Sequence, residues 1–157
     1  MGAVSAYVGL GANLGDAANS VRIAIDLLAQ LPQTKLSACS SLYRAAPIDA
    51  TGDDFVNAAV QLETQLDAHT LLAELQRIEQ RFGRERPFRN APRTLDLDLI
   101  FHGDTCCQTT ELTLPHPRWQ ARAFVLHPLA EVWPERVSPQ ALSAVADQAI
   151  EKLTDKQ

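Results

Sequence analysis

The sequence predicts an α+β domain in which an antiparallel sheet packs against helices. Three observations support this fold class. The predicted elements follow the order β-α-β-β-α-β, the predicted strands are short apolar or alternating runs, and the clearest helix has a regular apolar stripe. A chain of 157 residues has the length of one domain with a sizeable core, so we expect residues 1–157 to form a single domain.

The first part of the chain predicts a strand, a helix and a second strand. Residues 5–11, SAYVGLG, form a short apolar strand. Asn13 or Asp16 can cap the helix that follows, and Pro32 closes this helix. Residues 35–43, KLSACSSLY, are predicted to form the second strand. The apolar face of the helix includes Val21, Ile25 and Leu28.

The middle of the chain predicts a strand, the clearest helix and another strand. Residues 45–54 contain Pro, Gly and three acids and are predicted to form a loop. Residues 55–64, FVNAAVQLET, alternate well enough for a strand. A helix over 68–82 ends at Gly83, and the strand TLDLDLIF follows at 94–101. The apolar stripe of this helix consists of Leu71, Leu72, Leu75 and Ile78.

The remaining residues predict a C-terminal extension. A turn at 102–104 leads into short extended pieces, and residues 113–122 form a loop or a single helical turn. A last helix is expected near 139–150. The complete order is typical of the split-βαβ, ferredoxin-like α/β sandwich.

Composition excludes several classes of protein. The net charge of −5 argues against general nucleic-acid binding. No apolar run reaches the roughly 18 residues that predict a transmembrane helix, and the first residues lack the basic region of a signal peptide. Three cysteines, two of them adjacent, match neither a disulfide framework nor a zinc motif. We therefore expect a cytoplasmic protein with reduced cysteines.

Two aspartates lie inside the strand at 94–101, although Asp is depleted from strands. Because side chains alternate between faces, Asp96 and Asp98 share one face, roughly 6–7 Å apart. The opposite face, predicted to be core, consists of Leu95, Leu97, Leu99 and Phe101. One interpretation is a half-exposed strand whose outer face happens to be acidic.

The neighbouring residues favour a different interpretation. Six of the eleven arginines lie between Arg77 and Arg93, and Arg suits bidentate contact with phosphate. Two nearby carboxylates suit Mg²⁺, which usually completes its shell with waters and phosphate oxygens. Paired metals in phosphoryl-transfer sites lie about 3.5–4 Å apart, a distance that these side chains could bridge. The pattern therefore predicts a site for a metal-bound polyphosphate.

Other nucleotide-binding signatures are absent. In GLGANLG, residues 9–15, the last glycine lies one residue too far along for the dinucleotide-binding motif, and no Walker lysine is present. We expect these glycines to form a tight strand-to-helix turn beside the site.

The most specific motif is Arg89-x-Ala91-Pro92-Arg93-x-x-Asp96-Leu97-Asp98-Leu99-Ile100. With this motif the chain resembles the 6-hydroxymethyl-7,8-dihydropterin pyrophosphokinase family, and the resemblance extends over nearly the whole chain. The other matching segments are GLGANLG at 9–15, SLYR at 41–44, FVNAA at 55–59, Gln76-x-x-Glu79, Gly83-Arg84-x-Arg86, LTLPH at 112–116 and Arg122-x-Phe124.

The resemblance implies an ATP-dependent diphosphokinase of folate biosynthesis. Such an enzyme transfers diphosphate from ATP to the hydroxymethyl oxygen of the pterin and releases AMP. The family pattern implies that Asp96 and Asp98 hold two Mg²⁺ ions and that Arg84 and Arg93 stabilise charge on the transferred group. Asp98 as acceptor of the hydroxyl proton is a further hypothesis.

The same resemblance implies a pterin-binding site. Phe55 and Phe124 would stack on the flat ring, and Asn57, which has both donors and an acceptor, would bind its edge. Plain core packing is the alternative for the two phenylalanines, and a turn at a strand end is the alternative for Asn57. The other implied pterin contacts are Ala46, Pro47 and Ile48.

The nucleotide site implied by the family pattern is larger. Gln76 and Glu79 lie on one face of their helix, where a solvated surface is the alternative. His116 lies between two prolines and either donates to a phosphate or covers a loop. The complete set of ATP-binding residues is Gln76, Glu79, Arg84, Arg86, Arg93, Leu99, Thr113, His116 and Arg122.

The chain departs from the family pattern at a few positions, and two other functions compete. Ala45-Ala46 replaces the usual Thr-Pro, Phe88 stands near a position where some relatives have tryptophan, and Glu111 replaces a basic residue.

Another Mg²⁺-dependent transferase on a ferredoxin-like frame would share the aspartates but release pyrophosphate. An RNA-binding sandwich is disfavoured by the acidic charge. We expect a monomer that binds ATP and the pterin, without nucleic-acid or membrane partners.

Overall fold

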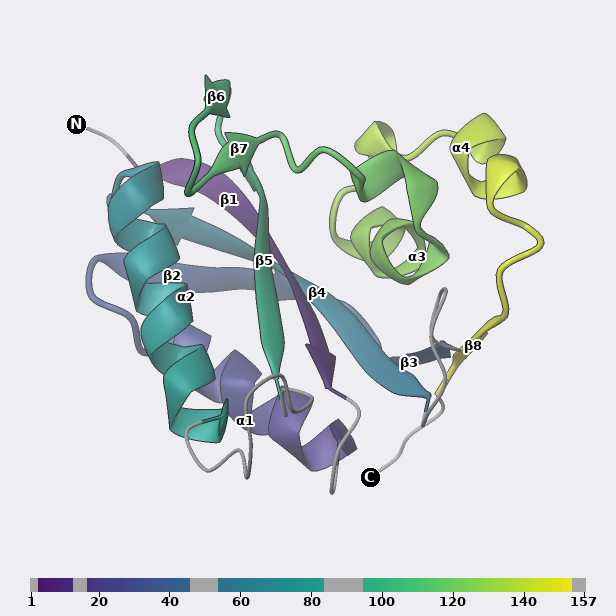
Figure 1. Cartoon of the computed structure of the whole chain (residues 1–157), viewed down its shortest axis with the longest axis horizontal. Helices are drawn as coiled ribbons and strands as arrows, with labels where there is room; N and C mark the ends of the chain where they lie inside the picture. Colours follow the sequence, from purple (N-terminus) through teal and green to yellow (C-terminus); the bar gives the residue numbers. More distant parts are fainter. Residues whose placement is uncertain (1–2, 13–16, 46–53, 84–94, 154–157) are drawn as a thin grey trace.

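The computed structural model describes residues 3–12, 17–45, 54–83 and 95–153. A six-stranded antiparallel sheet has the order β5-β1-β4-β3-β8, and β2 also pairs with β4 (Figure 1). Its strands are β1 Val4–Ala12, β2 Thr34–Cys39, β3 Tyr43–Ala45, β4 Phe55–Thr64, β5 Asp96–His102 and β8 Ile150–Lys152. A small second sheet pairs β6 Cys107–Gln108 with β7 Thr113–Leu114. The predicted α+β class and the order of the first elements are confirmed.

Helices cover both faces of the large sheet. Helices α1 and α2 lie on one face, and α3 and α4 lie on the other (Figure 1). Their bounds are α1 Ala17–Ala29, α2 Ala68–Gly83, α3 Ala123–Val132 and α4 Pro139–Ala144, with 3-10 turns at Trp119–Ala121 and Pro134–Arg136. No helix in the described ranges combines the length and apolar character needed to cross a membrane.

The first face of the sheet packs into a continuous core. Val8, Leu10 and Leu62 of the central strands are almost completely buried against Leu28 of α1 and Leu75 of α2. These positions follow the period of two in the strands and about 3.6 in the helices. The apolar stripes predicted for both helices therefore face the core.

A β-bulge in β5 changes which residues face this core. Val8 pairs with Leu99 but Tyr7 pairs with Phe101, so Ile100 is an extra residue in β5. An extra residue reverses the alternation that follows it. Ile100 and Phe101 consequently pack on the second face, and the prediction that Phe101 shares a face with Leu97 is wrong.

Beyond the bulge, Phe101 joins a cluster of aromatic rings under α3. Its ring centroid lies 5.1 Å from that of Trp119 and 5.2 Å from that of Trp133, both in edge-on geometry. Trp133 also stacks on Tyr7 at 4.3 Å, and the Arg136 guanidinium lies 5.0 Å from the centre of the Phe101 ring. This cluster fills one end of the second face, and a pocket lies at the other end.

The predicted strand 35–43 is two strands with a break between them. The Ser40 hydroxyl accepts from the Ala59 amide at 2.9 Å, and the Ser40 amide donates to the Ala59 carbonyl at 2.9 Å. The Ser40 hydroxyl thus accepts the hydrogen bond that a backbone carbonyl would accept in a continuous strand. The strand pairing resumes at Tyr43, which lies opposite Asn57.

The C-terminal extension differs most from the prediction. Helix α3 was not predicted, because Pro128 interrupts its pattern and its apolar residues occur all around it. The helix expected at 139–150 ends at Ala144, and the final residues of that range turn back so that Ile150 pairs with Ala45 of β3.

A polar cluster joins β3, α3 and β8. Glu131 of α3 accepts from the Tyr43 hydroxyl in a short hydrogen bond and from the Ser41 amide at 2.8 Å. Lys152 of β8 lies 3.7 Å from the same carboxylate. Burial, together with the Glu131 carboxylate, raises the pKa of Tyr43 above its ordinary value.

Candidate active site

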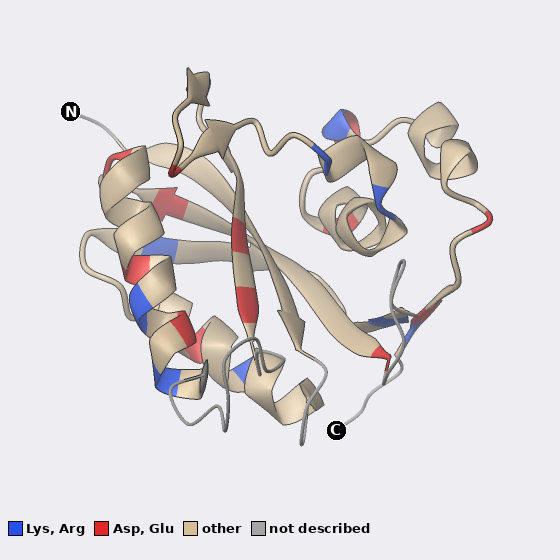
Figure 2. Ribbon diagram, viewed as in Figure 1, with Lys and Arg blue, Asp and Glu red and all other residues tan. Residues whose placement is uncertain are grey.

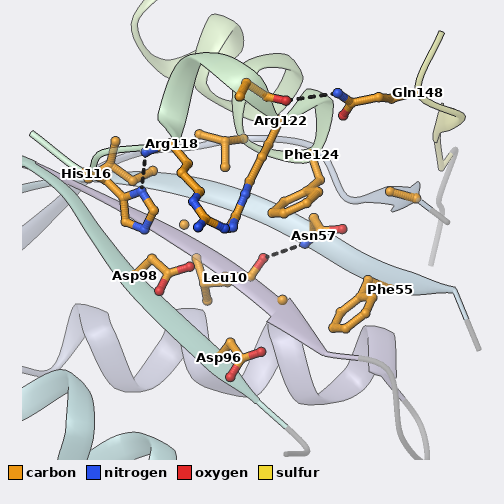
Figure 3. Close-up of a pocket in the computed structure, with 16 residues that line it drawn as sticks. Leu10, Phe55, Asn57, Asp96, Asp98, His116, Arg118, Arg122, Phe124 and Gln148 are labelled. Atoms are coloured by element: carbon orange, nitrogen blue, oxygen red, sulfur yellow. Dashed lines mark hydrogen bonds between the residues drawn. The ribbon is translucent and has the colours of Figure 1, made fainter. Parts of the chain in front are cut away.

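The open end of the second face forms a pocket of about 600 Å³. Strands β1, β4 and β5 form its floor, the segment from His116 to Val125 forms a wall, and Gln148 lies at its rim (Figure 3). Most of the strand residues that form the floor are small or polar, and they are Gly9, Gly11, Asn57, Asp96 and Asp98.

Asp96 and Asp98 of β5 both line this pocket and are half-buried. They alternate with Leu97 and Leu99, which lie in the core on the opposite face. The sequence-based prediction that these two carboxylates share one face is therefore confirmed. Figure 3 places both on the pocket floor.

Two arginines approach the carboxylates from the opposite wall. Arg118 and Arg122 both line the pocket, and their guanidinium groups point towards the side of the pocket where Asp98 lies (Figure 3). Figure 2 shows the two acidic positions on β5 and the basic positions on the segment between β7 and α3. The pocket thus has an acidic floor and a basic wall, an arrangement that suits a phosphate group carrying a metal ion.

The donor set fits a magnesium ion that keeps outside ligands. Across the described ranges no three His, Cys, Asp or Glu side chains gather closely enough to enclose a metal ion. Two oxygen donors, Asp96 and Asp98, line the pocket instead. Mg²⁺ is commonly held by one or two carboxylates, with waters and substrate phosphates completing its shell.

His116 lies beside Asp98 with a fixed orientation. Its amide donates to the Ile100 carbonyl at 2.9 Å, and its Nδ1 accepts from the Arg118 amide at 3.2 Å. The neutral ring therefore carries its proton on Nε2, an assignment that follows from this hydrogen bond. Burial lowers the pKa of His116; Asp98 opposes the shift, and Arg122 and Arg118 add to it. The ring is a neutral hydrogen-bond donor at pH 7.

Asn57 of β4 presents an incomplete hydrogen-bonding group. It is 5 % exposed, and its Nδ2 donates to the Leu10 carbonyl at 3.4 Å. Its Oδ1 is buried and, within the part of the chain that the structure describes, accepts no hydrogen bond. A buried acceptor left in this state costs free energy, so a ligand that donates here would be bound favourably.

Gly11 makes room for this side chain. A Cβ at position 11 would lie 2.8 Å from Asn57 Nδ2, closer than real Cβ atoms approach. Gly9 and Gly11 are interior residues of β1, so the prediction that they form a strand-to-helix turn is wrong. Gly15 lies outside the described residues.

Two half-buried phenylalanine rings lie on either side of Asn57 (Figure 3). Phe55 comes from the first residue of β4 and Phe124 from the first turn of α3. The Arg122 guanidinium lies 5.4 Å from the centre of the Phe124 ring. Both rings line the pocket rather than lying wholly inside a core, which favours the predicted stacking role.

Of the predicted ATP-binding residues that the structure describes, four do not line the pocket. Gln76 is exposed on α2, Thr113 lies in β7, and the Leu99 side chain is buried in the core. Glu79 accepts from the Leu97 amide at 2.8 Å and so joins α2 to the edge strand β5. Their roles in nucleotide binding remain predictions, and Leu99 could contribute only through its backbone.

Several predicted site residues lie outside the described residues. They are Ala46, Pro47, Ile48, Arg84, Arg86 and Arg93, together with Phe88 of the departures from the family pattern.

The structure adds pocket residues that the sequence did not predict. Arg118 carried a usable signal, because it lies between His116 and Arg122 in a short segment. Ile100 faces the pocket because of the bulge in β5, and Gln148 reaches it from beyond α4. The motif at 89–100 includes Ile100 without predicting that its side chain reaches the pocket, and no local pattern marks Gln148.

Comparisons with known proteins identify relatives of this chain. A family model described as 7,8-dihydro-6-hydroxymethylpterin-pyrophosphokinase (HPPK) matches residues 7–134. The chain is 44% identical over 136 residues to a 2-amino-4-hydroxy-6-hydroxymethyldihydropteridine pyrophosphokinase from Synechocystis, covering 87% of this chain and 70% of the relative. A protein of the same name from Pseudomonas aeruginosa is 41% identical over 154 residues, with 94% and 95% covered.

A solved structure gives independent support for the fold. The structure of an HPPK-DHPS in complex with substrates matches with a TM-score of 0.65 at 13% identity. The match covers 92% of this chain and 43% of that chain. At this identity the likeness concerns the fold alone.

Proposed function

The chain belongs to the 7,8-dihydro-6-hydroxymethylpterin-pyrophosphokinase family, and we propose that the pocket described above is its active site. The enzyme transfers diphosphate from ATP to the hydroxymethyl group of 6-hydroxymethyl-7,8-dihydropterin in folate synthesis. The observation that carries the assignment of the pocket is the pairing of two half-sites on one surface. One half-site combines two carboxylates with arginines, and the other combines a buried amide with two phenylalanine rings.

In the first half-site Asp96 and Asp98 would hold Mg²⁺, and we propose two ions, as in the family pattern. Bound Mg²⁺ would neutralise part of the triphosphate charge and orient its oxygens. Arg118 and Arg122 lie on the opposite wall and would contact phosphate oxygens as bidentate donors. His116 would donate from Nε2 to a phosphate oxygen, because its Nδ1 is already an acceptor.

In the second half-site the pterin ring would lie between Phe55 and Phe124. Its edge has N–H groups beside acceptors, and Asn57 Oδ1 is a buried acceptor without a partner among the described residues. A pterin N–H group would donate a hydrogen bond to this oxygen. Ala46, Pro47 and Ile48 are proposed to contact the same edge, next to Ala45 at the end of β3.

The chemical step needs positioning more than covalent help from the protein. The hydroxymethyl oxygen attacks the β-phosphorus, the bond from the β-phosphorus to the oxygen bridging to the α-phosphorus breaks, and AMP leaves with that oxygen. Positive side chains stabilise the charge on the transferred group, and we propose Arg84 and Arg93 for this role together with Arg122.

We propose Asp98 as the acceptor of the hydroxyl proton, since it lines the pocket close to the basic wall. The pH–rate profile of Asp98→Asn tests this role under saturating Mg²⁺. Loss of the acidic limb of the profile is expected, whereas an unchanged profile with metal still bound would exclude it.

Release of AMP from ATP, Mg²⁺ and 6-hydroxymethyl-7,8-dihydropterin tests the assignment of the pocket. Asp96→Ala should abolish AMP release, and Asp104→Ala is a matched control because Asp104 is exposed in the turn after β5. Equal activity of Asp96→Ala and the control would refute the proposed metal site. Pyrophosphate in place of AMP would indicate the competing transferase reaction.

We also propose that residues 1–157 act as one monomeric domain in the cytoplasm. The three cysteines are free in the structure, which suits a reducing compartment. Light scattering coupled to size exclusion tests the monomer: a mass near 17.2 kDa is expected, and twice that mass would contradict it.

A further inference from the structure

Gln148 joins the C-terminal segment to the wall of the pocket. Its Oε1 accepts from the Ala123 amide at 2.8 Å, and its Nε2 donates to the Ala121 carbonyl at 2.9 Å. These two backbone groups lie immediately before and after Arg122. The side chain therefore brackets a single residue, and Figure 3 shows it above the arginine at the pocket rim.

Arg122 is the single residue between two helical segments, and its own side chain does not cap either of them. It separates the 3-10 turn at Trp119–Ala121 from α3, and its φ of −128° and ψ of 120° are extended. Arg122 is the N-cap of α3 but makes no side-chain cap hydrogen bond. The Ala123 amide is one of the unpaired donors that begin every helix, and Gln148 supplies its partner from 25 residues away.

We propose that Gln148 is a positioning residue for diphosphate transfer, and that it acts by holding Arg122 aimed at the phosphates of ATP. The proposal rests on the proposed role of Arg122 in phosphate binding. Fixing both neighbouring peptide groups restricts the backbone from which the guanidinium extends. A phosphate-binding group displaced by about 1 Å can lose up to about a hundredfold in rate.

The amide is the side chain that the two contacts require. One contact needs an acceptor and the other a donor, and Gln offers both on one planar group. Glu at this position would keep the contact with the Ala123 amide but would place an ionised oxygen against the Ala121 carbonyl. Gln148→Glu consequently removes the hydrogen bond to the Ala121 carbonyl and keeps the one from the Ala123 amide, with almost no change of side-chain volume.

Binding of Mg²⁺ with a non-hydrolysable ATP analogue, measured by calorimetry without pterin, tests the proposal. Gln148→Ala is expected to weaken binding about tenfold, and Gln148→Glu by a smaller factor at pH 8. The loss of affinity in Gln148→Glu, relative to wild type at the same pH, should become smaller as the pH is lowered. The protonated carboxyl can then donate to the Ala121 carbonyl. Gln120→Ala is the matched control, because Gln120 is exposed in the same 3-10 turn and should bind like wild type.

A double-mutant cycle separates positioning from general support. Arg122→Ala alone should weaken binding, and adding Gln148→Ala should then change it less than twofold. A full tenfold further loss in that background would overturn the proposal, as would wild-type binding by Gln148→Ala. Melting temperatures identify a variant that fails to fold, in which case Gln148→Glu carries the cycle.

The outcomes also distinguish the proposal from the function on which it rests. Unchanged binding by Arg122→Ala would remove Arg122 from the phosphate site and would overturn both. Weakened binding by Arg122→Ala with unchanged binding by both Gln148 variants would overturn only the role of Gln148.

Discussion

The two faces of the sheet use the same strands for different purposes. On the face of α1 and α2, large apolar side chains such as Leu62 and Leu75 are completely buried. On the opposite face, α3 and the aromatic cluster cover one end, and the other end is the pocket. Adjacent residues of β5 illustrate the contrast, because Leu97 lies in the core and Asp98 lines the pocket.

The difference shows where this chain accepts unfavourable strand residues. The open part of the second face contains Gly9, Gly11, Asn57, Asp96 and Asp98, all of residue types that are depleted from strands. The packed face supplies the burial that stabilises the sheet around them. If this division holds, substitutions on the pocket face should reduce activity, and substitutions on the packed face should reduce stability.

The largest effect should come from the pocket face of β5. Asp98→Ala is expected to lower kcat/KM by about a thousandfold, about 4 kcal/mol, because it removes an oxygen donor for Mg²⁺. Steady-state AMP release measures the loss. The melting temperature of Asp98→Ala should stay close to that of wild type. A large fall in this temperature would contradict the division between the two faces.

The neighbouring residue should show the reverse pattern. Leu97→Ala leaves a cavity in the core and is expected to reduce the free energy of unfolding by about 3 kcal/mol. Urea unfolding measures this change. The folded variant should keep most of its kcat at low temperature, so a loss of activity as large as that of Asp98→Ala would break the comparison.

A smaller effect is expected from Gly11 beside the amide of Asn57. Gly11→Ala should weaken binding of a pterin analogue about tenfold, about 1.4 kcal/mol, because its Cβ would collide with Asn57 Nδ2. Binding of the ATP analogue should be nearly unchanged. Gly9→Ala is the control, because its Cβ would meet the flexible end of Ile100 at 3.2 Å. Equal losses in both variants would exclude a specific role for Gly11.

The smallest effect should be a pH dependence of stability at His116. The pKa of His116 is lowered in the folded protein, so the unfolded chain takes up this proton first as the pH falls. The contribution of the neutral ring is present above the unfolded pKa of about 6.5 and is lost as the pH falls through the folded pKa. Melting temperatures from pH 8 to pH 5 should therefore fall less steeply for His116→Gln than for wild type. Parallel curves would show that burial of this ring does not matter.

The sequence was sufficient where structure follows from local patterns. The apolar period in α2 and the alternation in β4 predicted both elements to within one residue, and the spacing of Asp96 and Asp98 predicted their shared face. The family resemblance pointed to Phe55, Asn57, His116, Arg122 and Phe124, which all line the pocket.

Tertiary contacts decided the features that the sequence did not reveal. The bulge at Ile100 depends on pairing with β1, and the break at Ser40 depends on its contacts with Ala59. Helix α3 depends on burial of a segment that contains a proline, because no cap or amphipathic period marks it. Gln148 and Arg122 are distant in sequence, and only the fold brings them together.

The contact between Glu79 and the Leu97 amide has a consequence for behaviour at high concentration. Strand β5 is at one edge of the six-stranded sheet, where outward amide groups can pair with a strand of another molecule. Glu79 already binds one of these amides, and the His116 amide binds the Ile100 carbonyl on the same strand. Two backbone groups of this edge strand are therefore already paired, and we expect these contacts to disfavour addition of a strand from another molecule at β5.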